Sequence, residues 1–186
     1  MSISVPEKVW WKPIDKEEKI WLALALIWML ISFVWMPIYH FIGKQNPSSE
    51  SYKAPRGQFE QLANDFIQKY QVKDANGAPV VMHDIPVVHP PAGGDAYLVG
   101  AGWKWTPVLE LEKGKTYRIH LGSYDFQHGL SIYPLNINYM VIPNQDYVIT
   151  VTPTTTSDKF PDGFPIICNE FCGIGHHTMV GRIIVK

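Results

Sequence analysis

Charged side chains are missing from one long stretch of this 186-residue sequence. No Asp, Glu, Lys or Arg occurs in residues 20–43, where IWLALALIWMLISFVWMPIYHFIG has Ser32, Tyr39 and His40 as its only polar groups. At about 1.5 Å rise per residue, a helix of this length covers about 36 Å, more than the roughly 30 Å of a membrane's hydrocarbon core. We therefore expect a transmembrane helix over residues 20–43, preceded by an N-terminal segment, residues 1–19.

Small residues are also missing where a signal peptidase would cut. A secretory signal has an apolar region of about 7 to 15 residues followed by a small-residue cleavage site, whereas Tyr39, His40 and Phe41 end this longer run. A retained anchor is therefore favoured over a cleaved signal. Cations flank the run on both sides, so the positive-inside rule hardly distinguishes its two orientations: Lys8, Lys12, Lys16 and Lys19 precede it, and Lys44, Lys53 and Arg56 follow it.

Residues 44–186 lack an excess of positive charge. They contain 12 Lys and Arg against 13 Asp and Glu, so no basic face for nucleic acid is indicated. Near-neutrality also favours partners recognised by shape and apolar contact over long-range electrostatic steering. No internal repeat or low-complexity tract is present.

The remaining sequence divides into a linker and a strand-rich region. Residues 44–95 read as a linker, polar and rich in Pro and Ser at its start, that contains a short amphipathic helix at about 58–70 with Phe59, Leu62, Phe66 and Tyr70 on one face. Packing of this helix on protein is favoured over packing on the membrane surface. Residues 96–186 show strand patterns at 116–121, 129–133, 137–142, 146–152 and 180–185, which favour an all-β sandwich or small barrel.

Metal-binding residue types concentrate in residues 168–179, CNEFCGIGHHTM. The candidate ligands there are Cys168, Cys172, His176 and Met179, and His128 stands 40 residues upstream of Cys168 in DFQHGL. Thiolate, thioether and imidazole together favour copper over magnesium, calcium or manganese. His177 points differently from its neighbour His176 and is expected to be exposed.

Three other arrangements compete with a dinuclear copper site. Cys168 and Cys172 could form a disulfide, a structural zinc site would leave Met179 without a purpose, and a blue copper site needs only one Cys, two His and a Met. A blue copper site leaves Cys168 unexplained. A dinuclear centre uses every candidate, with two bridging sulfurs, one His per copper, Met179 on one ion and a backbone carbonyl on the other.

The string C-x-E-x-C-G-x-G-H-x-x-M, with His128 upstream, resembles the copper A centre in subunit 2 of haem-copper cytochrome c oxidases. The single apolar span, HGLSIYPLNINYMVIPNQ and IICNEFCGIGHHTMVGRIIVK are most similar to the ba-type (B-family) enzymes. The resemblance covers residues 96–186 well and residues 44–95 poorly. It implies a cupredoxin-like Greek-key sandwich or barrel behind one N-terminal transmembrane helix.

Carried over by position, the resemblance implies that Cys168 and Cys172 bridge the coppers and that His128 and His176 are the terminal ligands. Met179 would be the weak ligand, and Glu170 would contribute its main-chain carbonyl. In many other oxidases this Glu side chain also helps hold magnesium, but the nearest ba-type relatives have Gln there, which leaves magnesium at Glu170 open.

The resemblance also implies a role for aromatic side chains and for apolar packing. Trp103 and Trp105, in AGWKWTP, fall where the family carries an aromatic segment for electron uptake, although core packing explains either residue equally well. Apolar neighbours are expected to be buried and to keep water off the sulfurs: Ile166, Ile167, Phe171 and Ile174.

The function implied is one-electron relay at the outer, periplasmic side of the cell membrane. Cytochrome c would donate, and a haem in subunit 1 would receive the electron and reduce oxygen to water. The chain itself shows no haem site, oxygen site or proton channel, so it would be an enzyme subunit and not a catalyst alone. Two alternatives remain: the copper A subunit of a nitric oxide reductase, and a membrane-anchored copper carrier, which would favour fewer and more exchangeable ligands. Nitrous oxide reductase would need a large second copper domain.

Overall fold

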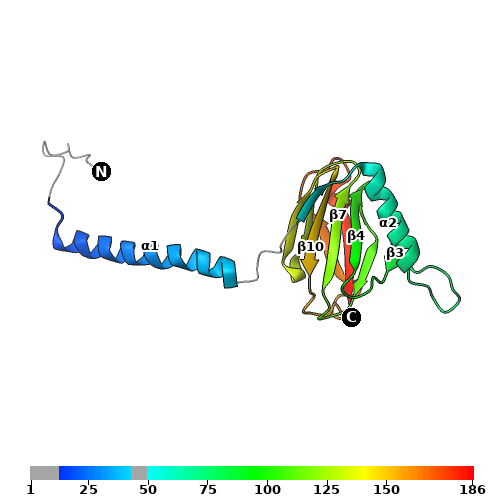
Figure 1. The fold of residues 1–186 in the computed structure, drawn as a ribbon, viewed down its shortest axis with the longest axis horizontal. Helices are drawn as coiled ribbons and strands as arrows, with labels where there is room; N and C mark the ends of the chain where they lie inside the picture. The colour runs from blue at the N-terminus through cyan, green and yellow to red at the C-terminus, as the bar shows by residue number, and fades with distance from the viewer. Residues whose placement is uncertain (1–12, 43–49) are drawn as a thin grey trace. The chain divides into compact units, whose positions relative to one another are not determined.

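The computed structural model describes residues 13–42 and 50–186, in two units that contain the long helix α1 and the described strands respectively (Figure 1). Helix α1 spans Lys16–Ile42 and is long and apolar enough to cross a membrane, by length and composition. It begins four residues before the predicted span because Asp15 and Glu18 form a capping box: each side chain accepts the other's backbone N–H, at 2.8 and 3.2 Å. Most of the predicted N-terminal segment, residues 1–12, lies outside the described residues, as does Gly43.

The second unit is a sandwich of two mixed sheets. The first sheet has the order β1-β10-β7-β4-β5 and the second the order β2-β3-β6-β12-β11-β8-β9. The β4–β7, β3–β6 and β6–β12 pairs are parallel, and the other pairs are antiparallel. The strands are β1 Glu50–Lys53, β2 Val81–Met82, β3 Ile85–Val88, β4 Asp95–Ala101, β5 Lys104–Thr106, β6 Val108–Leu111, β7 Tyr117–Ser123, β8 His128–Ile132, β9 Ile137–Val141, β10 Gln145–Val151, β11 Phe164–Cys168 and β12 Val180–Val185.

The core lies between the two sheets and follows the period-two pattern of the strands. On β7, Tyr117, Ile119 and Leu121 are buried, whereas Arg118 between them is exposed. All five predicted strands are present as β7, β8, β9, β10 and β12, with bounds within two residues of those expected. Buried residues alternate with more exposed ones along β9, β12 and the first five residues of β7, whereas β8 and β10 also bury adjacent residues.

Helix α2 (Arg56–Tyr70) lies against β4 on the outer side of the first sheet (Figure 1). Phe59 and Phe66 are buried, and both rings contact Tyr97 of β4, with centroids 5.7 and 5.6 Å away. Leu62, expected on the same face, is 42% exposed. Helix α2 therefore covers the residues where a helix was expected and packs on protein, with a narrower contact face than the sequence indicated.

Residues 50–95 differ from the expected linker, because they supply several elements of the sandwich. Strand β1 pairs with β10, where Tyr52 lies opposite Asp146, and β3 pairs in parallel with β6. These strands are short, and their partners are distant in sequence, so local periodicity carries little signal for them. These residues belong to the domain because their strands pair with β10 and β6 in the tertiary structure.

Candidate metal centre

The predicted ligands come from two strands and the loop between β11 and β12. His128 begins β8, Cys168 ends β11, and the loop after Cys168 returns to β12 through the short 3₁₀ helix η2 (His176–Thr178). Two backbone bonds tie the base of this loop: Cys168 N–H donates to the carbonyl of Met179 at 3.2 Å, and Asn169 N–H donates to that of Gly129 at 3.1 Å. The sheet therefore holds both ends of the loop next to His128.

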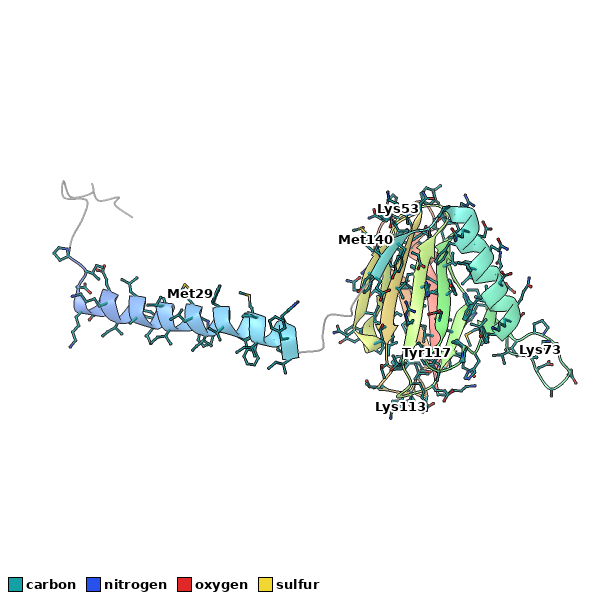
Figure 2. The ribbon with its side chains drawn as sticks, viewed as in Figure 1. Met29, Lys53, Lys73, Lys113, Tyr117 and Met140 are labelled. Carbon is teal, nitrogen blue, oxygen red and sulfur yellow. The ribbon has the colours of Figure 1, made fainter. Side chains whose placement is uncertain are left out.

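The site lies at one end of the sandwich. Gly129, next to His128, pairs with Met140 of β9, and Figure 2 shows Met140 at the opposite end of the domain from Lys113. Lys113 donates its backbone N–H to the carbonyl of the last residue, Lys186. The candidate centre is thus remote from the C-terminus.

Two free cysteines form the middle of the site. The Sγ atoms of Cys168 and Cys172 are 3.7 Å apart, well beyond the roughly 2.05 Å of a disulfide. His128 Nδ1 lies 3.8 Å from Cys168 Sγ. The ligand atoms of these three residues lie within 4.8 Å of one another, and all three side chains are buried. This is a sulfur and imidazole group with the spacing and softness suited to a transition metal.

The remaining predicted ligands surround the two sulfurs from the loop. His176 Nδ1 is 3.6 Å and Met179 Sδ is 3.7 Å from Cys172 Sγ. The carbonyl oxygen of Glu170 lies 3.2 Å from Cys168 Sγ. The structure therefore brings together every residue that the sequence singled out as a ligand, while His177 is exposed.

Burial raises the pKa of the Cys172 thiol to about 11, and the neighbouring Cys168 adds to the effect by hydrogen bonding and charge. In the metal-free protein this thiol therefore keeps its proton at neutral pH. Because a thiolate is the ligand form, metal binding has to displace that proton.

The apolar residues expected to shield the sulfurs divide into two groups. Ile166 is fully buried, whereas Phe171 and Ile174 are 81% and 89% exposed and Ile167 is 48% exposed. The expectation is wrong for these three residues, because Phe171 and Ile174 lie on the free side of the loop and Ile167 lies on the outer face of β11. The sulfurs are enclosed instead by the core side chains and by the other ligands.

The two tryptophans of AGWKWTP have different positions. Trp103 is 37% exposed, and its indole Nε1–H donates to the carbonyl of Cys172 at 3.0 Å. Its ring covers Gly175, where an added Cβ would come within 2.3 Å of it. Trp105 is fully buried and meets the His128 ring edge to face at 5.9 Å. Trp105 is therefore a core residue behind a ligand, and Trp103 is the tryptophan at the surface.

Sequence reasoning missed Asp125, which contacts His128 on the side away from the sulfurs. Asp125 Oδ1 is 2.8 Å from His128 Nε2 and accepts the backbone N–H of Phe126 at 2.7 Å, and Oδ2 accepts that of Gly102 at 2.8 Å. Partial burial acts to raise the pKa of this carboxyl, but the hydrogen bonds from Gly102, His128 and Phe126 outweigh it and the pKa is lowered. The only local signal was an Asp three residues before the candidate ligand in SYDFQH.

Comparison with known proteins gives the class of protein that this chain resembles. No protein-family model matches it. Over 85 residues, 46% of the chain, it is 38% identical to a cytochrome c oxidase subunit 2 of Thermus thermophilus, of which the match covers 58%. A second cytochrome c oxidase subunit 2 of the same species is also 38% identical over 85 residues, which are 47% of its length. The chain thus spans about half the length of the curated relatives it matches, and the expected resemblance to cytochrome c oxidase subunit 2 is confirmed.

A solved structure shares the fold. A chain of a haem-copper terminal oxidase dimer, seen by cryo-electron microscopy, aligns with a TM-score of 0.53 at 24% identity and covers 92% of this chain and 100% of its own length. The periplasmic domain of cytochrome oxidase subunit II from Bradyrhizobium japonicum aligns with a TM-score of 0.44 at 18% identity, over 52% of this chain and 86% of its own. The predicted all-β, cupredoxin-like sandwich with one N-terminal apolar helix is confirmed.

Proposed function

We propose that this chain is the electron-accepting subunit of a haem-copper terminal oxidase and that its ligands hold a dinuclear copper A centre. One observation carries the proposal: each of two neighbouring sulfurs has its own imidazole nitrogen and its own third donor. Cys168 has His128 and the Glu170 carbonyl, and Cys172 has His176 and Met179. Such a duplicated set suits two soft metal ions that share both sulfurs.

The geometry favours two ions over one. The ligand atoms of His128, Cys168 and Cys172 lie within 4.8 Å of one another, but His176 does not join this group. A tetrahedral zinc site needs four ligands around one point and would leave the buried Met179 unused. A blue copper site would leave unused one of two cysteines whose sulfurs are 3.7 Å apart.

A copper pair bound here would supply one-electron relay, with the odd electron shared between two sulfur-bridged ions. The chain's own contribution is to hold the ligands fixed. The less the ligands move when an electron is transferred, the lower is the reorganisation energy of that transfer. The backbone bonds of Cys168 and Asn169 close the loop on the sheet. Trp103 is 37% exposed and donates a hydrogen bond to the Cys172 carbonyl, so it provides a route for electrons from the surface to the centre.

The partners and location follow from the same proposal. Helix α1 anchors the chain as a single pass in the lipid of the cell membrane, with the copper domain on the outer, periplasmic side. Cytochrome c donates electrons, and the haem of subunit 1 receives them for the reduction of oxygen to water. The exposed side chains of Phe171 and Ile174 support an apolar docking surface at the loop, and the near-neutral charge of the domain agrees with it.

Two finer assignments stay predictions. The similarity of this chain to the ba-type (B-family) oxidases in particular rests on the sequence resemblance alone. For magnesium, the Glu170 side chain lies 3.5 Å from the Gln127 amide, and the described residues contain no group of three His, Cys, Asp or Glu ligands around it.

A membrane-anchored copper carrier is the alternative from a different class. Carriers exchange metal through few, accessible ligands, whereas Cys168, Cys172, His128 and Met179 are all buried, which favours a resident cofactor. The copper A subunit of a nitric oxide reductase would have the same site. Purifying the native complex and measuring oxygen consumption against nitric oxide reduction separates the two reductases.

The test of the dinuclear site uses the full chain in detergent, loaded with copper. We expect a purple protein whose electron paramagnetic resonance spectrum has seven lines, from one electron shared by two copper nuclei. Cys168→Ser should abolish this pattern, because it removes one bridge. A four-line spectrum from the wild-type protein, or a seven-line spectrum that survives in the variant, would refute the assignment.

A further inference from the structure

The His128 ring is held on three sides before any metal is considered. Its side chain is fully buried, and the Trp105 ring packs edge to face against it at 5.9 Å. Nε2 lies 2.8 Å from Asp125 Oδ1, and Nδ1 lies 3.8 Å from Cys168 Sγ. One ring nitrogen therefore faces a carboxylate, and the other faces the sulfur pair.

The carboxylate decides which nitrogen carries the proton. Asp125 is surrounded by donors: the Phe126 N–H on Oδ1 and the Gly102 N–H on Oδ2. An ionised carboxylate can only accept hydrogen bonds, so Nε2 of His128 must donate. In the neutral ring this leaves the lone pair on Nδ1, the nitrogen that faces Cys168.

The second oxygen of Asp125 holds a different segment, the turn between β4 and β5. Gly102 and Trp103 at the centre of this turn both have positive φ, +55° and +59°, a conformation uncommon for a bulky residue. The Trp103 indole then donates to the carbonyl of Cys172. A chain of contacts thus runs from His128 through Asp125 and this turn to the other cysteine.

His176, the second imidazole, has a different support. It lies in the η2 turn, half-buried, with its Nδ1 3.6 Å from Cys172 Sγ and the exposed Phe171 ring 5.8 Å from its own. A ring contact restricts orientation but does not select a tautomer.

We propose that Asp125 is a positioning residue, which fixes His128 with Nδ1 toward the sulfurs and ties the Trp103 turn to the same ligand. This inference deepens the proposed function and rests on it for the identity of the metal. Carboxylate partners of ligand histidines orient the ring and increase its basicity, and their removal commonly weakens metal binding about 10- to 100-fold.

The first test needs no metal. In the full chain, labelled with ¹⁵N-histidine, metal-free, reduced and at mildly alkaline pH, we expect nuclear magnetic resonance to show His128 with its proton on Nε2. The resonance is assigned by its loss in His128→Gln. In Asp125→Asn, which keeps the size but offers one acceptor oxygen instead of two, we expect a mixture of tautomers and faster amide exchange at Gly102.

The second test uses copper. Asp125→Asn should bind copper about 10- to 100-fold more weakly and should raise the reduction potential, because a negative charge that stabilises the oxidised state is lost. Asp125→Glu, which keeps the charge, should recover part of both properties. Asp158→Asn is the matched control, because Asp158 is an exposed aspartate whose carboxylate accepts the Thr156 hydroxyl in the segment after β10, and it should change neither property.

The outcomes separate this inference from the proposed function. A wild-type protein without the seven-line spectrum would overturn the dinuclear site while leaving the tautomer measurement meaningful. A normal spectrum in the wild type with unchanged affinity and potential in Asp125→Asn would overturn the role of Asp125 alone. If Asp125→Asn fails to fold, the tautomer of His128 in the wild-type protein still tests the role of Asp125. A proton on Nδ1 of His128 contradicts the inference.

Discussion

The two histidines of the candidate centre have opposite surroundings, although each lies beside one sulfur of the same pair. His128 begins a strand, is fully buried and is backed by the Asp125 carboxylate and the Trp105 ring. His176 belongs to a loop, is half-buried and has an exposed phenylalanine as its neighbour. One imidazole of the site is thus built into the core, while the other is partly exposed, although both sulfurs and Met179 are buried.

The two histidines should therefore contribute differently to the stability of the domain. A ligand in the core is held by packing that also stabilises the domain, so its removal affects both stability and metal binding. A ligand in a surface loop can be changed at little cost to folding, and it lies where a partner protein can approach. Substitutions on the two sides should therefore have separable effects.

The largest effect is expected for His128→Ala compared with His176→Ala in the metal-free full chain. His128→Ala leaves a cavity beneath Trp105 and deprives Asp125 of a partner, so it should lower the free energy of unfolding by about 3 kcal/mol. His176→Ala should change it by less than about 1 kcal/mol, although both variants should lose the seven-line spectrum. Denaturant titration measures the difference, and equal destabilisation would contradict the contrast between the two sides.

A third histidine tests whether a carboxylate partner matters in the same way outside the site. Burial alone would lower the pKa of His120, but the hydrogen bond and charge of Asp146, 2.7 Å from Nδ1, and the charge of Asp95 outweigh it, so the pKa lies above its ordinary value of 6.5. The unfolded chain therefore loses this proton first as the pH rises. The stabilisation is complete below about 6.5 and is lost as the pH rises through the raised pKa of the folded state.

In His120→Gln, the free energy of unfolding should accordingly decrease less between mildly acidic and alkaline pH than it does in the wild type. At mildly acidic pH this free energy should be lower by about 2 kcal/mol, because Asp146 loses its partner. Denaturant titrations across this range measure both effects. Copper binding should be unchanged, because His120 lies outside the ligand group. A variant with the wild-type pH profile would show that this pair contributes nothing to the pH dependence.

The smallest effect is expected on the loop side, at Gly175. A Cβ there would meet the Trp103 ring at 2.3 Å, so Gly175→Ala should displace the indole from the Cys172 carbonyl. The free energy of unfolding should fall by about 1 to 2 kcal/mol. The difference in tryptophan fluorescence from the wild-type protein, in which the other six tryptophans are the same, and denaturant titration report the change. Gly57→Ala is the control, since a Cβ there meets nothing within 4 Å and a helical alanine should stabilise by about 0.5 to 1 kcal/mol. Unchanged fluorescence in Gly175→Ala would show that the indole is not confined there.

The successful predictions share a physical basis in local pattern. The apolar run at residues 20–43 is continuous, and buried residues alternate with more exposed ones along predicted strands such as β9 and β12, so each pattern indicated its own structure. Four ligand candidates fall within residues 168–179, close enough in sequence to be seen as one group. His128 was identified as their distant companion, and the pairing of β8 with β11 brings it to them.

The features that escaped prediction depend on contacts between distant segments. Residues 50–95 looked like a linker because β1 and β3 are short and pair with strands far along the chain. Phe171 and Ile174 were expected to be buried because their side chains are apolar. The neighbouring sequence does not indicate that the loop places both side chains in solvent. Trp103 and Trp105 are two residues apart, and only the β4–β5 turn places one at the surface and the other behind His128.

The amino-acid sequence therefore established the apolar helix, the β-rich domain and the chemical character of the ligand loop, because periodicity and local spacing are properties of neighbouring residues. Tertiary structure decided which histidine is buried, which tryptophan reaches the surface and which carboxylate supports the site. Those outcomes depend on the register of β8 against β11 and on the turn between β4 and β5, which bring Asp125, Trp103 and Cys172 into one chain of hydrogen bonds from separate parts of the sequence.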